Sequence, residues 1–395
     1  MGSFDSSFFD TIQDRSDTGS VKYNVGLCRG RNADIIPMWV ADMDFKIPPA
    51  VQNALFAVIE HGILGYTETD TEYDAALCDW YRRRMNWDLN PKWNIQMPSV
   101  MFGISSAIRA MTDPGDSILI CQPVYHPFVK IISVNKRYPV ISELRLADGR
   151  YEIDFADFED KILRNKVKAF LFCSPHNPVG RVWTEKELRE IGWICVKHDV
   201  NIISDEIHSD FIYKEHRHIP IASLSDELAD RTVTCTSPTK TFNLAGLQAA
   251  NIIVPNPLLR NKIRKAGLAT GYSGLNTMAI TATKAAYLYS EEWFDGLLAY
   301  LQENAAIVRN AFPNGGDITL IDPEGTYLMW LDCRRLSLSD SELEKMFLEK
   351  AGVWLYRGTV FGVGGSGFMR MNIACPRMIL RKAVSKIEQA IKSKE

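Results

Sequence analysis

Residues 236–247 read TSPTKTFNLAGL and lie between a β-branched run at 231–235 and an apolar run at 249–254. Both runs are predicted strands, so Lys240 follows the end of a strand, in a turn of small residues. In an open α/β sheet, ligands bind at the carboxyl ends of the strands. A lysine there can bond covalently to a carbonyl cofactor, while Ser237 and Thr239 hold a phosphate. Alone, the stretch is more typical of a solvated surface turn, so the choice between that turn and a cofactor-binding lysine depends on the rest of the chain.

Predicted strands and helices alternate from about residue 99 onward. The strands fall at 117–122, 138–143, 167–173 and 200–204. Helices are predicted at 104–111, at 127–135 and after Thr184, which forms a capping box with Glu187. Such strand–helix–strand units predict an α/β fold whose large domain has a mainly parallel sheet flanked by helices.

The two ends of the chain follow other patterns. Residues 1–35 are polar and suggest an extended arm, and helices are predicted at 50–61, ending at Gly62, and at 72–85. After about residue 280 we predict one long helix at 279–311, strands at 318–321, 325–332, 353–356 and 368–373, a capped helix after Ser339 and a final helix after Pro376. The N-terminal segment and the C-terminal part together predict a smaller α+β domain. The expected divisions are 1–48, 49–285 and 286–395.

The composition is that of an ordinary globular protein, with 46% hydrophobic and 24% charged residues. A net charge of −3 gives no overall attraction to nucleic acid or to anionic membranes. No apolar run approaches the roughly 20 residues that cross a bilayer, and no secretory signal is visible, so we expect a cytoplasmic protein. The eight cysteines include no C-x-x-C pair, which favours reduced core cysteines over zinc or disulfide roles.

Polar and aromatic residues follow several of the predicted strands. Asn177 lies in a tight Pro/Gly turn, where it either aims its amide at a ligand or satisfies the turn itself. Asp205 directly follows an apolar strand and needs a cationic partner, such as a protonated ring nitrogen. Tyr125 either stacks on a flat ring or packs in the core. Arg370, in an apolar strand near the C-terminus, either binds a substrate carboxylate or forms a structural salt bridge.

A metal site is the rival interpretation of this region. Asp205 with His208, or His216 with His218, could begin a ligand set. A third and a fourth ligand at suitable spacing are missing, so we predict no metal.

The four strand-end residues Tyr125, Asn177, Asp205 and Lys240 together resemble those of pyridoxal-phosphate (PLP) enzymes of the aspartate aminotransferase fold, class I/II. The resemblance covers nearly the whole chain and is closest to the MalY/PatB/cystalysin type of carbon–sulfur β-lyase. The motifs that carry it are MWVADMDF at 38–45, HG at 61–62, GY at 65–66, SPHNP at 174–178, SDEIH at 204–208 and KTFN at 240–243.

The resemblance implies a role for each of these residues around the cofactor. Lys240 is expected to bond to the cofactor aldehyde and to act as the catalytic base. Asp205 pairs with the ring nitrogen, Asn177 donates to the ring hydroxyl, and Tyr125 stacks on the ring. The phosphate and the ring have further expected contacts, from Ser237, Thr239, the backbone amides of Val100 and Met101 at a helix start, His208, and Tyr66 of a neighbouring subunit. The last contact implies a homodimer with shared sites.

Substrate binding is likewise implied. Arg370 grips the substrate carboxylate, and R-x-N-x-x-x-P at 370–376 matches the family pattern. The other expected substrate contacts are Asn177, Ala41, Tyr66 and His126.

Two positions depart from ordinary aminotransferases. Those enzymes usually have a tyrosine at the position of His208 and a phosphate-binding arginine at the position of Gln248. Lyase-type relatives also lack both, so these positions favour a lyase. His126 stands where some lyases have a second tyrosine, which leaves substrate preference open. The expected reaction is α,β-elimination from cystathionine or another cysteine S-conjugate, giving a thiol, pyruvate and ammonia. A class I/II aminotransferase that needs a keto-acid acceptor and a regulatory or binding protein with little turnover stay open as alternatives.

Overall fold

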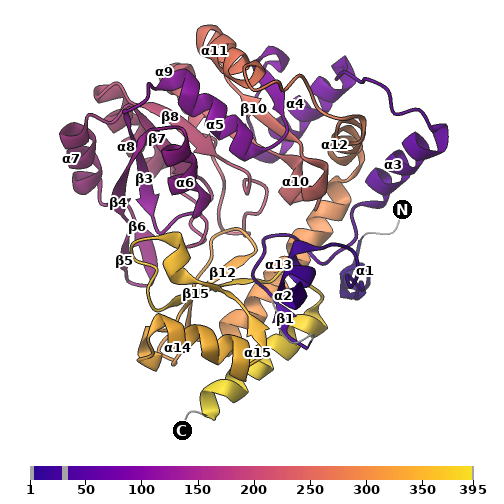
Figure 1. Cartoon of the computed structure of the whole chain (residues 1–395), viewed down its shortest axis with the longest axis vertical. Coiled ribbons are helices and arrows are strands. Elements are labelled where there is room, and N and C mark those ends of the chain that lie inside the picture. Colours follow the sequence, from indigo (N-terminus) through magenta and orange to yellow (C-terminus); the bar gives the residue numbers. More distant parts are fainter. Residues whose placement is uncertain (1–3, 29–33, 394–395) are drawn as a thin grey trace.

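A seven-stranded sheet forms the centre of the larger part of the molecule (Figure 1), in a computed structural model that describes residues 4–28 and 34–393. The strand order is β2-β10-β9-β8-β7-β3-β4. The strands are β2 Asn94–Met97, β3 Ser117–Gln122, β4 Tyr138–Glu143, β7 Ala169–Cys173, β8 Asn201–Asp205, β9 Thr232–Thr236 and β10 Ala250–Ile253. Strands β9, β8, β7, β3 and β4 pair in parallel, and β10 runs antiparallel to both of its neighbours. The predicted α/β fold with a mainly parallel sheet is confirmed.

Helices cover both faces of this sheet, and strand β7 shows why. Phe170 and Phe172 belong to the apolar cluster that includes side chains of α7 and α8. Ala169 and Leu171 belong to the cluster on the other face, with α5 and α6. Successive side chains of a strand point to opposite faces, so a strand that is apolar throughout is buried on both sides. The helices of this part are α5 Val100–Met111, α6 Pro127–Val134, α7 Phe155–Asn165, α8 Glu185–Lys197, α9 Asp226–Arg231, α10 Pro238–Thr241 and α11 Pro257–Leu268.

A smaller α+β part contains a four-stranded antiparallel sheet in the order β11-β12-β15-β14. Its strands are β11 Thr319–Ile321, β12 Leu328–Asp332, β14 Tyr356–Arg357 and β15 Phe368–Asn372. The N-terminal segment joins this part because β1 (Ile36–Pro37) pairs in parallel with β13 (Val353–Trp354). Figure 1 shows the two parts one above the other, with the indigo N-terminal segment beside the yellow C-terminal helices. The domain boundaries at 48/49 and 285/286 stay a prediction.

The remaining elements connect these sheets. Helix α3 ends where predicted, because Gly62 adopts a left-handed conformation with φ of 78°. Both predicted capping boxes, at Thr184 and at Ser339, are present. The other elements are α3 Pro49–His61, α4 Thr71–Met85, the hairpin β5 Arg145–Ala147 with β6 Arg150–Glu152, α14 Asp340–Lys345, a π-helical turn Met346–Lys350, α15 Arg377–Lys392 and the 3-10 turns Pro91–Trp93, Ile221–Ser223, Ala245–Leu247, Arg334–Leu336 and Gly358–Phe361.

Two predictions about the ends of the chain are wrong. The expected long helix is two helices, α12 (Thr277–Tyr289) and α13 (Glu291–Ala311), because Ser290 leaves helical geometry with φ of −120° and ψ of 17°. The expected extended arm instead forms α1 (Ser6–Asp10) and α2 (Val21–Cys28). Short helices are marginal alone, and α1 is stabilised by docking, since Phe9 is fully buried against Trp293 and Tyr300.

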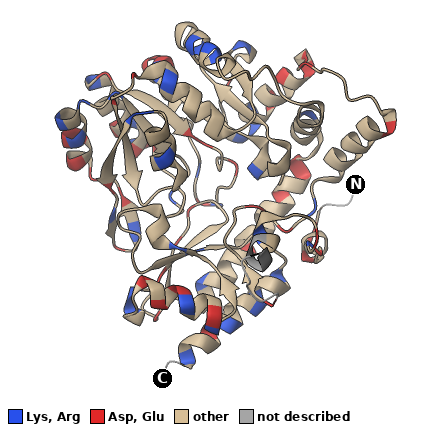
Figure 2. Ribbon diagram, in the orientation of Figure 1, with Lys and Arg blue, Asp and Glu red and all other residues tan. Residues whose placement is uncertain are grey.

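Charged side chains gather on the outer helices, and the central strands carry few of them (Figure 2). Among the described residues, no helix is long and apolar enough to cross a membrane. The seven cysteines whose side chains are described are all free and buried, as expected. The side chain of Cys28 lies outside the described residues.

Candidate active site

A cavity of about 390 Å³ opens where the parallel strands end and faces the N-terminal and C-terminal segments. All predicted site residues except Ser237 and Tyr66 line it. The lining side chains with polar, charged or aromatic groups are Trp39, Ser99, Tyr125, His126, Cys173, Asn177, Asp205, His208, Thr239, Lys240, Gln248, Tyr356 and Arg370.

The topology explains why the four strand-end residues meet. Tyr125 follows β3, Asn177 follows β7, Asp205 ends β8, and Lys240 follows β9. These four strands are neighbours in the order β9-β8-β7-β3 and run in parallel, so their carboxyl ends share one edge of the sheet. The structure therefore brings together residues that are up to 115 positions apart, the separation of Tyr125 and Lys240.

Lys240 lies on a one-turn helix, α10, where the sequence predicted a turn. Its Nζ donates to the carbonyl oxygen of Ala41 at 2.6 Å. Desolvation in the cavity lowers the pKa of Lys240 to about 8, helped by the charge of Arg370 and opposed by those of Asp42 and Asp205. A half-buried lysine with this pKa has an appreciable neutral fraction near pH 7.5, so it can accept a proton.

Asp205 is 4% exposed and has no cationic partner within ion-pair distance among the described residues. Its Oδ1 accepts a hydrogen bond from the backbone N–H of Ile207 at 3.2 Å. Burial raises the pKa of Asp205 to about 7, because removal from water disfavours the charged carboxylate. A cation bound in the cavity would relieve that penalty.

Arg370 is buried between two aromatic rings on the opposite wall. Its guanidinium carbon lies 5.2 Å from the ring centre of Tyr356 and 4.8 Å from that of Phe361. It donates to Asn177 Oδ1 at 3.0 Å and to the carbonyl of Trp39 at 2.9 Å, and its Nε has no partner. Burial lowers the pKa of Arg370 to about 10. An arginine with an unpaired N–H beside the cavity suits carboxylate binding.

The hydroxyls predicted to hold a phosphate lie behind the lysine. Ser237 caps α10, and its Oγ lies 2.6 Å from Thr239 Oγ1, which lines the cavity. On the facing side, Ser99 caps the twelve-residue helix α5, whose first residues are Val100 and Met101. Free backbone N–H groups at such a helix start favour an anion.

Two of the histidines that line the cavity, His208 and His126, have a buried Nδ1 without a hydrogen-bond partner. Burial lowers the pKa of His208 to about 3, helped by the charges of Lys240 and Arg370. Burial and Arg370 also lower the pKa of His126. Both side chains are therefore neutral hydrogen-bonding groups at neutral pH.

The rival metal interpretation finds no support among the described residues, which contain no group of three or more side chains suited to a metal ion. His218 instead pairs with Glu206 at 2.8 Å, and both side chains are buried. That contact occupies the His218 ring in a buried hydrogen bond.

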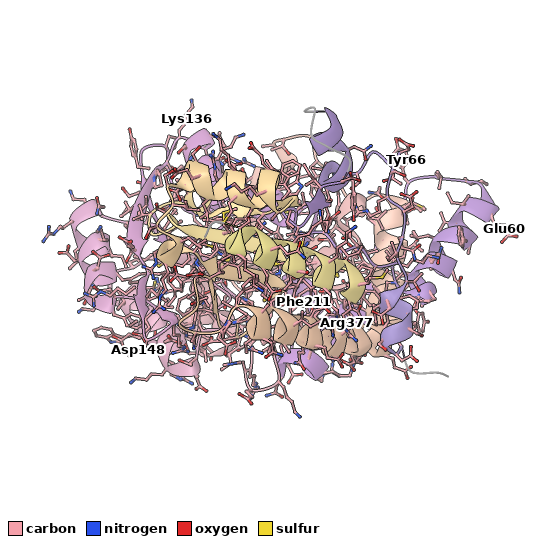
Figure 3. The ribbon with its side chains drawn as sticks, turned by 90° about the horizontal axis from the view of Figure 1, so that it is seen from below. Glu60, Tyr66, Lys136, Asp148, Phe211 and Arg377 are labelled. Carbon is pink, nitrogen blue, oxygen red and sulfur yellow. The ribbon has the colours of Figure 1, made fainter. Side chains whose placement is uncertain are left out.

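Tyr66 does not reach the cavity of its own chain. It is fully exposed, and Figure 3 shows it at the same edge of the molecule as Glu60 of α3. Phe56, Ile59, Ile63 and Leu64, on α3 and the segment after it, are also exposed by 57–70%. This edge is an apolar surface next to Tyr66.

Several residues at the cavity were not predicted from the sequence. Trp39 and Tyr356 line the cavity, and Phe361 completes the aromatic enclosure of Arg370. The Tyr327 hydroxyl donates to the carbonyl of Ala41 at 2.9 Å. Trp39 lies inside a quoted motif, so it could have been singled out, whereas Tyr356, Phe361 and Tyr327 carry no local signal.

The arrangement fits pyridoxal 5′-phosphate. The unpaired Asp205 carboxylate suits a basic ring nitrogen, the Lys240 amine suits an aldehyde, and Thr239 with the start of α5 suits a phosphate. Tyr125 contributes an aromatic ring to the same cavity. Because Arg370 engages Asn177 Oδ1, the amide NH₂ of Asn177 is left to donate to a ring oxygen.

Comparison with known proteins agrees with this fit. The sequence profile of the aminotransferase class I and II family matches residues 33–387. The chain is 41% identical over 388 residues to cystathionine beta-lyase PatB of Bacillus subtilis, covering 97% of this chain and 99% of that protein. It is 33% identical over 393 residues to protein MalY of Escherichia coli, covering 98% and 99%. The crystal structure of cystalysin from Treponema denticola, which contains pyridoxal 5′-phosphate, matches with a TM-score of 0.95 and 36% identity, covering 98% and 99%.

Proposed function

Because the chain belongs to the aminotransferase class I and II family, we propose that it is a PLP-dependent carbon–sulfur β-lyase of cystathionine or other cysteine S-conjugates. The net reaction converts one S-conjugate and one water into a thiol, pyruvate and ammonia. One observation carries the proposal: a single cavity holds an amine of lowered pKa, an unpaired carboxylate and an arginine with a free N–H. The amine would remove the α proton, the carboxylate would pair with the cofactor ring, and the arginine would bind the substrate carboxylate.

The cofactor, when bound, supplies an aromatic ring that withdraws the electron pair left at the substrate α carbon after deprotonation. Asp205 would pair with the protonated ring nitrogen and keep the ring electron-withdrawing. That pairing would offset the burial cost that raises the pKa of Asp205 to about 7. Thr239, Ser237 behind it, and the first N–H groups of α5 would hold the phosphate, while Tyr125 and His208 would border the ring.

Arg370 would orient the substrate through its carboxylate. The Tyr356 and Phe361 rings and the Trp39 carbonyl fix the guanidinium plane, so little conformational freedom is lost on binding. Ala41 and His126 line the same side of the cavity and are proposed further contacts of the substrate.

Lys240 would then remove the α proton. Its pKa of about 8 keeps a useful neutral fraction, and a base works best when its pKa lies near the working pH. The C–S bond breaks as its electron pair leaves with sulfur, and the thiolate takes up a proton to leave as the thiol. The remaining three-carbon enamine adds water and releases ammonia, which gives pyruvate.

A second copy of the chain would complete the site. Tyr66 is exposed in the single chain and adjoins the apolar surface of Phe56, Ile59, Ile63 and Leu64. Burial of this surface in a homodimer would carry Tyr66 toward the phosphate of the partner's cavity. We also expect a cytoplasmic enzyme, in line with the free, buried cysteines of the described chain.

The test is an assay of purified enzyme loaded with cofactor on L-cystathionine, without a keto acid. The proposal expects thiol, pyruvate and ammonia in equal amounts, and Lys240→Ala supplies the inactive control. Amino-group transfer to a keto acid, without pyruvate from the S-conjugate, would show that the protein is an aminotransferase and not a lyase. A folded, cofactor-loaded protein that performs neither reaction would favour a binding or regulatory role.

A further inference from the structure

We infer that Arg15 and Lys22 are positioning residues, which hold the loop at 39–44 so that its carbonyls orient Lys240 and Arg370. The inference rests on the proposed function only for its kinetic readout. These two residues form a partly buried ionic cluster with Asp42 and Asp44, and among the four only Asp42 is named above, for the effect of its charge on Lys240.

The loop at 39–44 orients both cationic groups of the site. The carbonyl of Ala41 accepts from Lys240 Nζ at 2.6 Å, and the carbonyl of Trp39 accepts from Arg370 Nη2 at 2.9 Å. Two residues on different walls of the cavity, from α10 and β15, therefore depend on one stretch of backbone. A shift of this loop would displace the proton acceptor and the carboxylate ligand together.

The side chains of the loop are held from the N-terminal segment. Arg15 spans both acids, with Nη2 2.7 Å from Asp42 Oδ2 and Nη1 2.7 Å from Asp44 Oδ1. Lys22 Nζ lies 2.7 Å from Asp44 Oδ2 and 3.9 Å from Asp42 Oδ1. Two cations and two anions thus form a closed cluster of zero net charge.

Because part of this cluster is buried, its charges must be well paired. The side chains of Lys22 and Asp44 are 1% and 3% exposed. Buried charges are tolerated only when they are well paired, and removal of one partner leaves the other uncompensated. The cluster therefore fixes the loop against the start of α2 more firmly than exposed ion pairs would.

The N-terminal segment also forms part of the cavity wall. Val21, the first residue of α2, lines the cavity, and Trp39 Nε1 donates to the carbonyl of Lys22 at 3.1 Å. Tyr23 lies 5.2 Å from the Arg15 guanidinium. On its other side, the loop is held by Asn372 Nδ2, which donates to the carbonyls at positions 40 and 42. The cluster supplies the restraint from the N-terminal side.

The experiment compares Arg15→Met, Lys22→Met and Arg15→Lys with wild type, all loaded with cofactor. The control is Arg150→Met, which breaks a 2.7 Å ion pair with Glu324 away from the cavity. The readouts are hydrogen exchange of the peptides that cover residues 36–45, and kcat and KM for L-cystathionine. We expect both methionine variants to exchange faster in these peptides and to lose at least about tenfold in kcat/KM, with a higher KM. Arg15→Lys should recover most of the loss, and Arg150→Met should match wild type in both readouts.

If the methionine variants do not fold, Asp42→Asn tests whether the cluster holds the loop, because asparagine has nearly the same shape as aspartate. The charge of Asp42 raises the pKa of Lys240, so this variant should shift the acid limb of the kcat profile to lower pH. If the cluster positions the loop, residues 36–45 of this variant should also exchange faster than in wild type. The inference is overturned if residues 36–45 exchange as in wild type while kcat/KM is kept, or if Arg150→Met causes equal losses. If wild type itself lacks lyase activity, the proposed function fails, and the exchange result still decides whether the cluster positions the loop.

Discussion

Lys240 Nζ lies 2.6 Å from the carbonyl oxygen of Ala41, a residue 199 positions earlier in the chain. A neutral carbonyl accepts a hydrogen bond from an ammonium without the charge stabilisation that a carboxylate would give. Desolvation by burial can therefore lower the pKa of Lys240 from 10.5 to about 8, whereas a lysine paired directly with an acid would stay protonated. This contact holds the amine in place and leaves it able to act as a base.

Lys240→Ala is expected to abolish covalent attachment of the cofactor and to lower kcat by about a hundredfold to ten-thousandfold, because the variant lacks the general base. Attachment is measured by borohydride reduction and mass spectrometry of the peptide with residue 240, and kcat by pyruvate release. Lys197→Ala, which removes an exposed lysine paired with Glu159, should behave as wild type. Retention of full activity by Lys240→Ala would rule out its role.

Asp205→Asn should weaken the pairing with the cofactor ring. Loss of one partner of a buried charge pair costs about 3–5 kcal/mol, so kcat/KM should fall by at least about a hundredfold. Asp205→Glu keeps the charge and should retain more activity than Asp205→Asn. Equal activity of Asp205→Asn and wild type would show that the ring does not depend on this carboxylate.

The protein without cofactor should become more stable relative to Lys240→Met as the pH rises from 8 to 10.5. The pKa of Lys240 is lower in the folded chain than in the unfolded chain, so the unfolded chain binds more protons in this window. Wild-type stability therefore increases with pH there, whereas the variant lacks this titration. The lowering from 10.5 to about 8 corresponds to at most ~3 kcal/mol, reduced by solvent because the side chain is half-buried.

The check is urea unfolding of both cofactor-free proteins at pH 7 and at pH 10.5, at equal protein concentration. Lys240→Met should be the more stable protein at pH 7, and its advantage should shrink or vanish at pH 10.5. A difference in free energy of unfolding that does not change with pH would show that Lys240 has an ordinary pKa in the folded chain.

Mixing two weakened variants should restore activity if the sites are shared. In a hybrid of Lys240→Ala and Tyr66→Ala subunits, one cavity combines both defects and the other has a native lysine with a native tyrosine from the partner. Activity should therefore rise after the two proteins are unfolded and refolded together, and should not rise when each is treated alone. No gain in a mixture that forms hybrids would place Tyr66 outside the partner's site.

The strand-end residues could be predicted from the sequence because parallel strands bring their carboxyl ends to one edge. Tyr125, Asn177, Asp205 and Lys240 each lie at or after the end of a predicted strand, so a local pattern was enough to group them. The aromatic enclosure of Arg370 could not be predicted in this way. It depends on the pairing of β14 with β15, which sets Tyr356 opposite Arg370, and on the turn that carries Phe361.

The wrong predictions at the ends of the chain likewise concern features that have no local sequence signal. Helix α1 depends on tertiary contacts of Phe9, which a polar local composition does not reveal. The interruption at Ser290 lacks proline or glycine, so the helical pattern on either side concealed it. The ionic cluster of Arg15, Lys22, Asp42 and Asp44 likewise joins segments that only the fold brings together.

We expect this site to eliminate a thiol and not to transfer an amino group. The most direct measurement is product partition in one reaction that contains the cofactor-loaded enzyme, a cysteine S-conjugate and 2-oxoglutarate. We predict pyruvate and thiol in equal amounts at a rate that does not depend on 2-oxoglutarate, with little glutamate. Glutamate formed in step with substrate loss, and a rate that requires 2-oxoglutarate, would contradict this prediction.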